Sequence, residues 1–265
     1  MTAFETFRER LRRGEVLLGP SVVFADARVT EALAPSVDFI WLELEHTLMD
    51  PQSVVAHGLA ARGAGVPLLL RVASGTTALI KPALDSGVQG LIVPQVRTVA
   101  EVRSIVDDVR YPPTGRRGMG PVRPSNYGRL SPHDVVAACA AEVFLAVQIE
   151  TVEALECVEE IAAVPGLDSL VVGPTDLSAS LGLLGEFDHP TVTDAVSRIV
   201  AAARANGLSV GVGVGTTATA VAMVRLGAQW VQLSGTDAYL WQRFEQLDRQ
   251  VRDALQDGGA ATPAP

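Results

Sequence analysis

The chain has 265 residues, of which 48% are hydrophobic and 19% are charged. This composition supports a full hydrophobic core and excludes a disordered or fibrous protein. The formal net charge of −9 argues against sequence-independent binding to nucleic acid, because such binding needs a surplus of lysine and arginine.

Eight short apolar segments predict parallel strands that helices cover on both faces. In chain order they are Val16–Phe24, Phe39–Leu44, Leu68–Val72, Gly90–Val93, Phe144–Ile149, Ser169–Val172, Leu208–Val212 and Trp230–Leu233. Segments of helical character lie between them, among them Thr98–Val109, Thr151–Val164 and Thr191–Asn206. Eight strand–helix alternations place the chain in the α/β class and favour a closed (β/α)8 barrel, with a doubly wound open sheet as the alternative.

Three segments stand outside this alternation. Residues 111–131 are rich in glycine, proline and arginine, and a long loop of this kind inside a compact domain is typically functional or disordered. The glycine-rich run 211–215 is interpreted as a tight turn after the seventh strand, with an anion-binding loop as the weaker alternative. Residues 257–265 are predicted to form a flexible tail, so that residues 1–256 make a single barrel domain.

An apolar stripe at helical spacing precedes the tail. Its members are Leu240, Trp241, Phe244, Leu247, Val251 and Leu255. The simpler interpretation is that this helix packs on the barrel, and the alternative is that it forms a subunit interface.

The two cysteines, Cys139 and Cys157, are too few for a disulfide framework, which favours reduced thiols in a cytoplasmic protein. The charged segment 1–15 lacks the continuous apolar stretch of a signal peptide. No run of about 18 apolar residues predicts a membrane span.

Polar residues follow four of the predicted strands, at the end of a barrel where active sites lie. These strand ends read Glu43-Leu44-Glu45-His46, Arg71, Gln148-Ile149-Glu150 and Gly173-Pro174-Thr175-Asp176. Any one of them could be a helix cap or a loop salt bridge, but four together predict a site.

Glu150 and Asp176 make a candidate site for a hard cation, because Mg²⁺ and Mn²⁺ prefer octahedral shells of oxygen. The alternative for Asp176 is the N-cap of the following helix. Zinc fits less well because the histidines lack zinc-ligand spacing. These histidines are His46, His57, His133 and His189.

His46 follows Glu43 and Glu45, and a carboxylate beside an imidazole is what a general base requires. Arg71 follows a buried apolar run and needs an anionic partner, which could be a substrate carboxylate, an enolate, or a salt bridge to Asp85 or Glu45. Schiff-base catalysis is disfavoured because Lys81 is the single lysine among 21 basic residues and lies on a predicted surface helix.

Six segments, in order between Asp38 and Gly182, resemble the HpcH/HpaI aldolases, which are metal-dependent pyruvate aldolases. They read DFIWLELEH, LLLRV, KPALDSGVQGLIVPQV, RYPPTGRRGMG, VQIET and PGLDSLVVGPTDLSASLG. The resemblance implies a (β/α)8 barrel of the phosphoenolpyruvate/pyruvate-domain type. It also implies a last helix exchanged between subunits and a homohexamer built as a trimer of dimers.

The resemblance also implies roles for individual residues. Glu150 and Asp176 would bind the divalent metal. Arg71 would stabilise the enolate of pyruvate, and His46, held by Glu43, would be the acid/base residue. Further substrate contacts are implied for Gln148, for the backbone of Gly173, Pro174 and Thr175, for Arg117 and Arg123 beside the aldehyde pocket, and for Asp85 at a neighbouring subunit's site.

The implied reaction is the reversible cleavage of a 4-hydroxy-2-oxo acid to pyruvate, or a close 2-oxo acid, and an aldehyde. It would use Mg²⁺, Mn²⁺ or Co²⁺ to stabilise the enolate and no organic cofactor, with small molecules rather than nucleic acid or membrane as partners. Two alternatives stay open. One is a related lyase or carbon–carbon bond-forming enzyme acting on an acyl-CoA or oxo acid, for which the Arg116–Arg129 loop would have to bind phosphates. The other is a barrel that senses an oxo acid without catalysis.

Three departures from the family pattern bear on activity and specificity. Glu43 stands where the family usually has aspartate, and Thr47 stands where it commonly has a small residue. The last strand reads VQLSGTD rather than ending in a VGSD-like turn.

Overall fold

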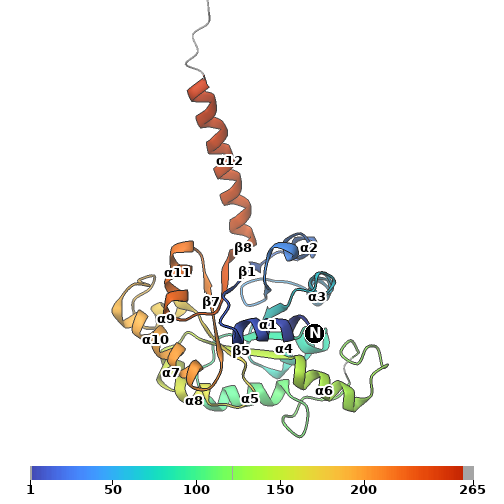
Figure 1. The fold of residues 1–265 in the computed structure, drawn as a ribbon. Coiled ribbons are helices and arrows are strands. Elements are labelled where there is room, and N and C mark those ends of the chain that lie inside the picture. The colour runs from blue at the N-terminus through green and yellow to red at the C-terminus, as the bar shows by residue number, and fades with distance from the viewer. Residues whose placement is uncertain (1, 121, 259–265) are drawn as a thin grey trace, which may run out of the picture.

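The computed structural model describes residues 2–120 and 122–258. Eight parallel strands close into a barrel in which each strand pairs with the next and the last returns to the first (Figure 1). They are β1 (Leu17–Val22), β2 (Ile40–Glu43), β3 (Leu68–Arg71), β4 (Gly90–Val93), β5 (Phe144–Ile149), β6 (Ser169–Val172), β7 (Ser209–Val214) and β8 (Trp230–Gly235). The closed barrel confirms the predicted fold, and the open-sheet alternative is wrong.

Helices connect the strands and surround the barrel. They are α1 (Ala3–Arg12), α2 (Arg28–Leu33) with the short 3₁₀ turn η1 (Ala34–Ser36), α3 (Pro51–Ala64), α4 (Thr77–Asp85), α5 (Val99–Val109), α6 (Pro132–Glu142), α7 (Val152–Glu156), α8 (Val158–Ala162), α9 (Pro174–Ser180), α10 (Pro190–Ala205), α11 (Thr217–Leu226) and α12 (Thr236–Gly258). The segment Thr151–Val164, predicted as one helix, is two short helices that meet at Cys157.

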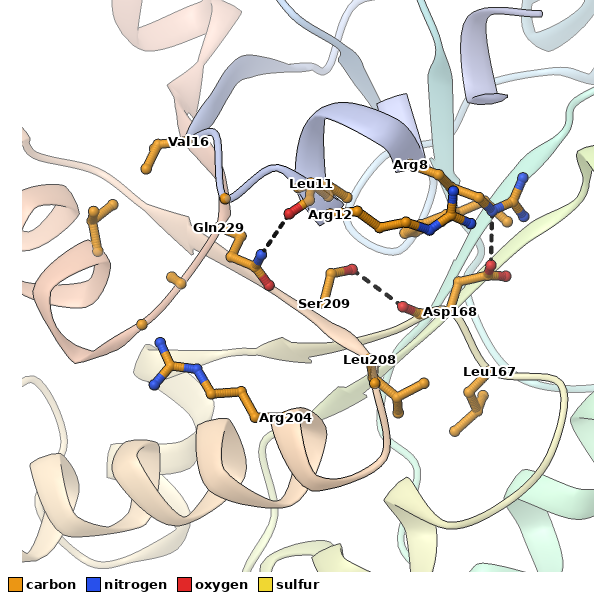
Figure 2. A pocket seen from close by; sticks show the side chains of 16 residues that line it. Arg8, Leu11, Arg12, Val16, Leu167, Asp168, Arg204, Leu208, Ser209 and Gln229 are labelled. Atoms are coloured by element: carbon orange, nitrogen blue, oxygen red, sulfur yellow. Dashed lines mark hydrogen bonds and ion pairs between the residues drawn. The ribbon is translucent and has the colours of Figure 1, made fainter. Parts of the chain in front are cut away.

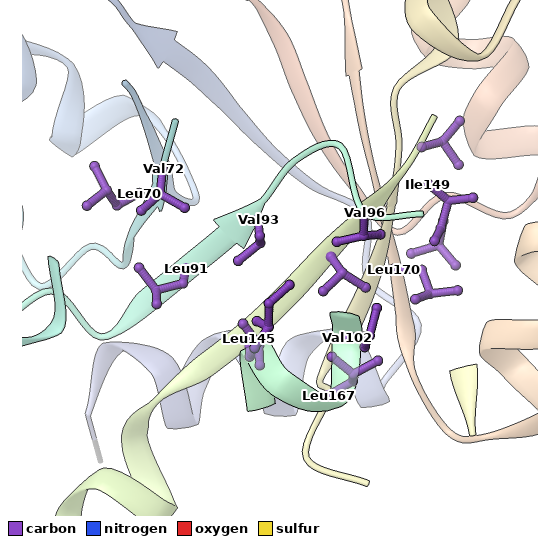
Figure 3. Close-up of a cluster of buried hydrophobic side chains, with 14 of the residues drawn as sticks. Leu70, Val72, Leu91, Val93, Val96, Val102, Leu145, Ile149, Leu167 and Leu170 are labelled. Carbon is purple, nitrogen blue, oxygen red and sulfur yellow. The ribbon is translucent and has the colours of Figure 1, made fainter. Parts of the chain in front are cut away.

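Two apolar layers hold the barrel together. The inner layer joins the amino ends of the strands to α1, where Phe7 packs edge-on against Phe144 with ring centroids 5.5 Å apart. The outer layer lies between strands and helices, and Figure 3 shows side chains such as Leu70 and Leu91 within it. Burial on both faces explains why the strands read as continuous apolar runs.

The glycine run 211–215 lies largely in a strand, so its interpretation as a turn is wrong. Gly211 and Gly213 belong to β7, which extends through Val214. A Cβ at Gly211 would collide with the fully buried ring of Trp230 on the neighbouring strand β8. The glycine therefore makes room for a large side chain inside the barrel.

Helix α12 leaves the barrel and projects away from it (Figure 1). Its apolar stripe is exposed, with Leu240 at 65%, Phe244 at 70% and Leu255 at 71% of their full accessible surface. The interpretation that this helix packs on its own barrel is therefore wrong. The helix runs through Gly258, two residues beyond the predicted domain end, and residues 259–265 of the predicted tail lie outside the described residues.

Among residues 2–120 and 122–258, no helix combines the length and the apolar character that crossing a membrane would require.

Candidate active site

A polar layer lies above the apolar interior at the carboxyl ends of the strands. Glu43 ends β2, Arg71 ends β3, and Gln148 lies near the end of β5. The residue two positions before each of them belongs to the inner apolar cluster, so alternation turns all three side chains inward. The strand register makes Glu43 and Arg71 direct neighbours across β2 and β3.

Arg71 is held by two glutamates. Its Nε donates to Oε2 of Glu43 over 2.7 Å, and its Nη2 lies 2.6 Å from the same oxygen. Its Nη1 forms an ion pair with Oε2 of Glu45 at 2.9 Å. The guanidinium also lies over the ring of Trp41, with Cζ 5.3 Å from the centroid. The structure thus confirms Glu45 as an anionic partner of Arg71 and adds Glu43, whereas the other candidate, Asp85, bonds elsewhere.

His46 lies on the loop after β2 with 69% of its side chain exposed. The predicted pairing of its imidazole with Glu43 is wrong, because Oε1 of Glu43 accepts the backbone N–H of His46, at 3.2 Å. The carboxylate beside the imidazole is that of Glu45, whose Oε2 lies 3.7 Å from Nε2 of His46. Strand β2 ends at Glu43, so residues 44–46 lie outside the strand, and it is Glu45 that lies beside the imidazole.

Glu150 is almost fully buried just after β5, with 1% of its surface exposed. Its Oε1 accepts the backbone N–H of Gln95 at 2.7 Å, and its Oε2 accepts from the side-chain amide of Gln148. Burial raises the pKa of Glu150 to about 7, and the nearby charges of Glu45 and Asp176 act in the same direction. A carboxylate of this kind favours a proton or a cation beside it.

The backbone of Gln95 is a part of the site that the sequence did not reveal. Gln95 has a φ of 58°, in the left-handed region that is uncommon for residues other than glycine. This conformation accompanies the N–H donated to Glu150, and backbone strain of this kind clusters at functional sites. Pro94 before it is the one signal in the sequence, because a proline cannot donate a backbone hydrogen bond and marks the end of β4.

The loop after β6 closes tightly on Glu150. A Cβ at Gly173 would collide with Oε2 of Glu150 and approach the amide of Gln148, so the backbone passes directly beside these two side chains. Helix α9 begins at Pro174, with Gly173 as its N-cap residue and no side chain capping it. Asp176 lies in the first turn and is exposed, so its interpretation as the N-cap is wrong.

The residues at these strand ends fit a divalent cation held jointly with a substrate. No ready-made cluster of three or more His, Cys, Asp or Glu ligands occurs in the described part of the chain. The site instead offers the carboxylates of Glu150 and Asp176 and the buried Oε1 of Gln148, which has no hydrogen-bond partner there. Oxygen donors that leave coordination positions for water and substrate suit Mg²⁺ or Mn²⁺.

Asp85, Arg117 and Arg123 gather at a different place within the chain. Asp85 ends α4, and its Oδ1 accepts from Nη2 of Arg117 at 2.7 Å. Arg117 and Arg123 line a cavity of about 240 Å³ together with residues 87–89, which lead into the amino end of β4. The structure therefore does not bring these three residues to the strand ends that carry Arg71 and Glu150 in the same chain.

Figure 2 shows a cavity of about 490 Å³ at the amino ends of the strands. Some of its polar groups bond to one another: Nε of Arg8 contacts Oδ1 of Asp168 at 2.9 Å, and Gln229 donates to the carbonyl of Leu11 at 3.0 Å. Within the described chain, none of the predicted site residues is among those that line it. This cavity is therefore a seam between α1 and the barrel rather than part of the candidate site.

Comparison with known proteins matches a region of the chain that includes these strand ends. The family model described as HpcH/HpaI aldolase/citrate lyase matches residues 24–241. A hydroxypyruvate/pyruvate aldolase of Roseovarius nubinhibens is 36% identical over 210 residues, which cover 77% of this chain and 81% of that protein. A 4-hydroxy-2-oxovalerate aldolase of Novosphingobium aromaticivorans is 37% identical over 214 residues, which cover 78% and 80%.

A solved structure shows the same architecture. The crystal structure of an HpcH/HpaI aldolase/citrate lyase family protein from Burkholderia cenocepacia superposes with a TM-score of 0.87 at 32% identity. The match covers 93% of this chain and 99% of that one. All four predicted strand ends lie within the region that the family model matches.

Proposed function

The chain belongs to the HpcH/HpaI aldolase/citrate lyase family, and on this premise we propose that it is a metal-dependent aldolase. The reaction is the reversible cleavage of a 4-hydroxy-2-oxo acid to pyruvate, or a close 2-oxo acid, and an aldehyde. The observation that carries the proposal is the buried polar layer at the strand ends. It holds Arg71 against Glu43 and Glu45, and the negative charge of Glu45 in turn acts on the buried carboxylate of Glu150.

Glu150 and Asp176 would hold the divalent cation, and Oε1 of Gln148, which is buried and without a hydrogen-bond partner in the described residues, would be a further oxygen donor beside them. The ion, for which Mg²⁺, Mn²⁺ and Co²⁺ are candidates, would act as a Lewis acid on the 2-oxo acid. The raised pKa of Glu150 supports this assignment, because a buried carboxylate without a counter-charge gains most from a bound cation. No organic cofactor enters the proposal.

Arg71 would stabilise the enolate oxygen that develops when the carbon–carbon bond breaks. Its guanidinium carries five N–H groups, and three of its nitrogens already contact Glu43 and Glu45. The remaining N–H groups are then available to a substrate oxygen. Because the guanidinium is held before the substrate arrives, it needs little reorganisation during the reaction. The backbone of residues 173–175 would contact the carboxylate of the 2-oxo acid.

His46 would take the proton from the 4-hydroxyl group in the cleavage direction, directly or through a water molecule. Its imidazole is exposed on the loop after β2, where an incoming substrate can reach it. Glu45 is the carboxylate next to the ring and would favour the positive charge that His46 gains as it accepts the proton.

The acyl-CoA alternative receives little support. It needs free basic residues on the Arg116–Arg129 loop to bind nucleotide phosphates. Two of the loop's four arginines are already engaged, since Arg116 pairs with Asp108 at 2.7 Å and Arg117 is buried and pairs with Asp85. The non-catalytic sensor is disfavoured because the residues that we propose for acid/base, enolate-stabilising and cation-binding roles, namely His46, Arg71, Glu150 and Asp176, all lie at or just after the carboxyl ends of strands.

A panel of aldehydes offered with pyruvate as donor tests the proposed function. We expect new 4-hydroxy-2-oxo acids whose masses equal pyruvate plus aldehyde, formed in the presence of Mg²⁺ or Mn²⁺. The readout is product mass, and a panel of CoA esters is run in parallel. Turnover of a CoA ester without any aldol product from pyruvate would contradict the proposal.

We also propose that α12 packs on a second copy of the chain in a homo-oligomer. In a (β/α)8 barrel the last helix covers the outer face of neighbouring strands, but here it projects away. Val16 before β1 and Leu18 within β1 are 43% and 44% exposed, which leaves apolar surface for another copy's α12. The same assembly would bring Asp85, Arg117 and Arg123 near a neighbouring site, and a hexamer is the state that we propose.

Reversing the character of the α12 stripe tests this assembly. The double variant Trp241→Glu/Phe244→Glu is expected to lower the molar mass measured by light scattering, because two buried charges would oppose the interface. Gln242→Glu/Gln246→Glu adds the same charge to the same helix away from the stripe and should keep the parent's mass. A monomeric parent protein would contradict the proposal.

The free thiols of Cys139 and Cys157 support a reducing compartment, and we propose that the protein is cytoplasmic.

A further inference from the structure

Glu43 is bound to Arg71 more closely than to any part of the His46 ring. The two residues end neighbouring strands and are direct partners in the register. Only 4% of the Glu43 side chain and 14% of the Arg71 side chain are exposed. Both Nε and Nη2 of Arg71 reach one oxygen, Oε2 of Glu43, at 2.7 and 2.6 Å. A contact between two nitrogens and one oxygen, away from water, fixes the plane of the guanidinium as well as its position.

The indole of Trp41 completes this support. Trp41 lies two residues before Glu43 on the same strand, and its Nε1 donates to Oε2 of Glu43 at 3.2 Å. The same ring lies beneath the guanidinium of Arg71. Oε2 of Glu43 therefore accepts hydrogen bonds from both Trp41 and Arg71. Because these two side chains also contact each other, the three side chains form one connected cluster.

The second oxygen of Glu43 is also occupied. Its Oε1 accepts the backbone N–H of Glu45 at 2.6 Å and that of His46 at 3.2 Å. The hydroxyl of Thr47 donates to the backbone carbonyl of Glu43. With both carboxylate oxygens engaged in this way, Glu43 anchors the loop backbone and leaves the imidazole of His46 to Glu45.

We infer that Glu43 is a positioning residue for Arg71: it orients the guanidinium that stabilises the enolate. This inference rests on the proposed aldolase function. The length of the side chain sets the geometry in this chain: Oε2 reaches Arg71 while Oε1 reaches the N–H groups of Glu45 and His46, and aspartate is one methylene shorter. Glu45 remains as a partner of Arg71 when Glu43 is changed, so the arginine is misplaced rather than left unpaired.

The test is a double-mutant cycle read by exchange of the methyl protons of pyruvate in D₂O with saturating Mg²⁺. Glu43→Gln is expected to lower the maximal exchange rate about 10- to 100-fold, as loss of a supporting partner does, with little change in the pyruvate concentration at half-rate. In an Arg71→Ala background, Glu43→Gln should lower the exchange rate less than threefold, because the guanidinium that Glu43 positions is absent. Equal losses in both backgrounds would overturn the inference.

Two further variants keep the result interpretable. Glu43→Asp retains the charge and should still lose about tenfold in exchange rate, because the shorter side chain holds Arg71 poorly. Parental exchange in both Glu43→Asp and Glu43→Gln would overturn the inference. Glu159→Gln breaks a surface pair in which Glu159 contacts Arg198 at 2.7 Å, and it is the matched control expected to exchange at the parent's rate. If the parent protein does not catalyse exchange of the pyruvate methyl protons, the proposed function fails. That outcome is distinct from a failure of the inference about Glu43.

Discussion

Replacing Arg71 with alanine is expected to slow the exchange of pyruvate methyl protons about 100- to 1000-fold, the usual effect of removing one donor to a developing oxyanion. The affinity for the divalent metal should stay within a few-fold of the parent's, because the proposed ligands Glu150 and Asp176 are unchanged. Exchange is followed by proton NMR in D₂O, and Mn²⁺ affinity by titration. Exchange within threefold of the parent's rate would show that Arg71 does not stabilise the enolate.

The Arg71→Ala variant also leaves Glu43 as a buried carboxylate without its cationic partner, whereas the half-buried Glu45 keeps His46 beside it. Removing one member of a buried ion pair typically costs about 3–5 kcal/mol of stability, so thermal unfolding must be measured beside exchange. Arg71→Lys keeps the charge but loses the planar fork, and we expect it to fold while still losing most of the exchange rate. Arg198→Ala removes an arginine from a surface pair and is the control for nonspecific effects.

Replacing Glu150 with glutamine is expected to abolish the stabilisation that divalent metal gives to the parent protein. Glutamine keeps the shape of the side chain but lacks the charge that the cation requires. In the parent, the rise in melting temperature on adding Mn²⁺ should be larger at pH 8 than at pH 5.5, because Glu150, with a pKa of about 7, must lose its proton to bind the ion. An equal metal-induced shift in parent and variant would contradict the assignment.

Without metal, Glu150→Gln is expected to raise the stability of the folded protein rather than to lower it. Because the pKa of Glu150 rises on folding from 4.5 to about 7, its contribution to stability is fully present below pH 4.5 and is lost as the pH rises through 7. That rise corresponds to a loss on the order of 3 kcal/mol. Metal-free Glu150→Gln should therefore be more stable than the metal-free parent at pH 8. Glu153→Gln, which changes an exposed side chain, should show neither effect.

The barrel could be predicted from the sequence because a strand that is buried on both faces consists mostly of apolar residues. A parallel strand covered by helices has no solvent-facing side chains, so each strand is a short unbroken apolar run. The polar residues that end four of these runs followed from the same pattern. Glu43, Arg71 and Gln148 were found in this way, and the structure brings them into one layer.

The partners within that layer could not be predicted, because they depend on strand register. The pairing of Glu43 with His46 was implied only by the family resemblance. The pairing of β2 with β3 instead sets Glu43 beside Arg71, which is 28 residues away. The Gln95 contact to Glu150 was missed for a related reason, since it uses a backbone N–H and leaves no mark in residue type.

The errors at β7 and at α12 have physical causes of the same kind. The glycines of β7 suggested a turn, but they accommodate Trp230 from the next strand, a contact that local sequence does not reveal. The stripe on α12 was correctly recognised as apolar. An apolar stripe does not identify the surface against which its helix packs. The stripe residues of α12 are exposed, so the helix does not pack on the barrel of its own chain.

Exchange of pyruvate methyl protons by the parent protein, before and after removal of metal, tests the central claim most directly. The protein is chelated exhaustively, assayed in D₂O, and assayed again after addition of Mg²⁺, Mn²⁺ or Co²⁺. We predict that exchange disappears on chelation, returns with the metal, and does not return in Glu150→Gln. Full exchange after exhaustive chelation, or none under any metal, would contradict the account.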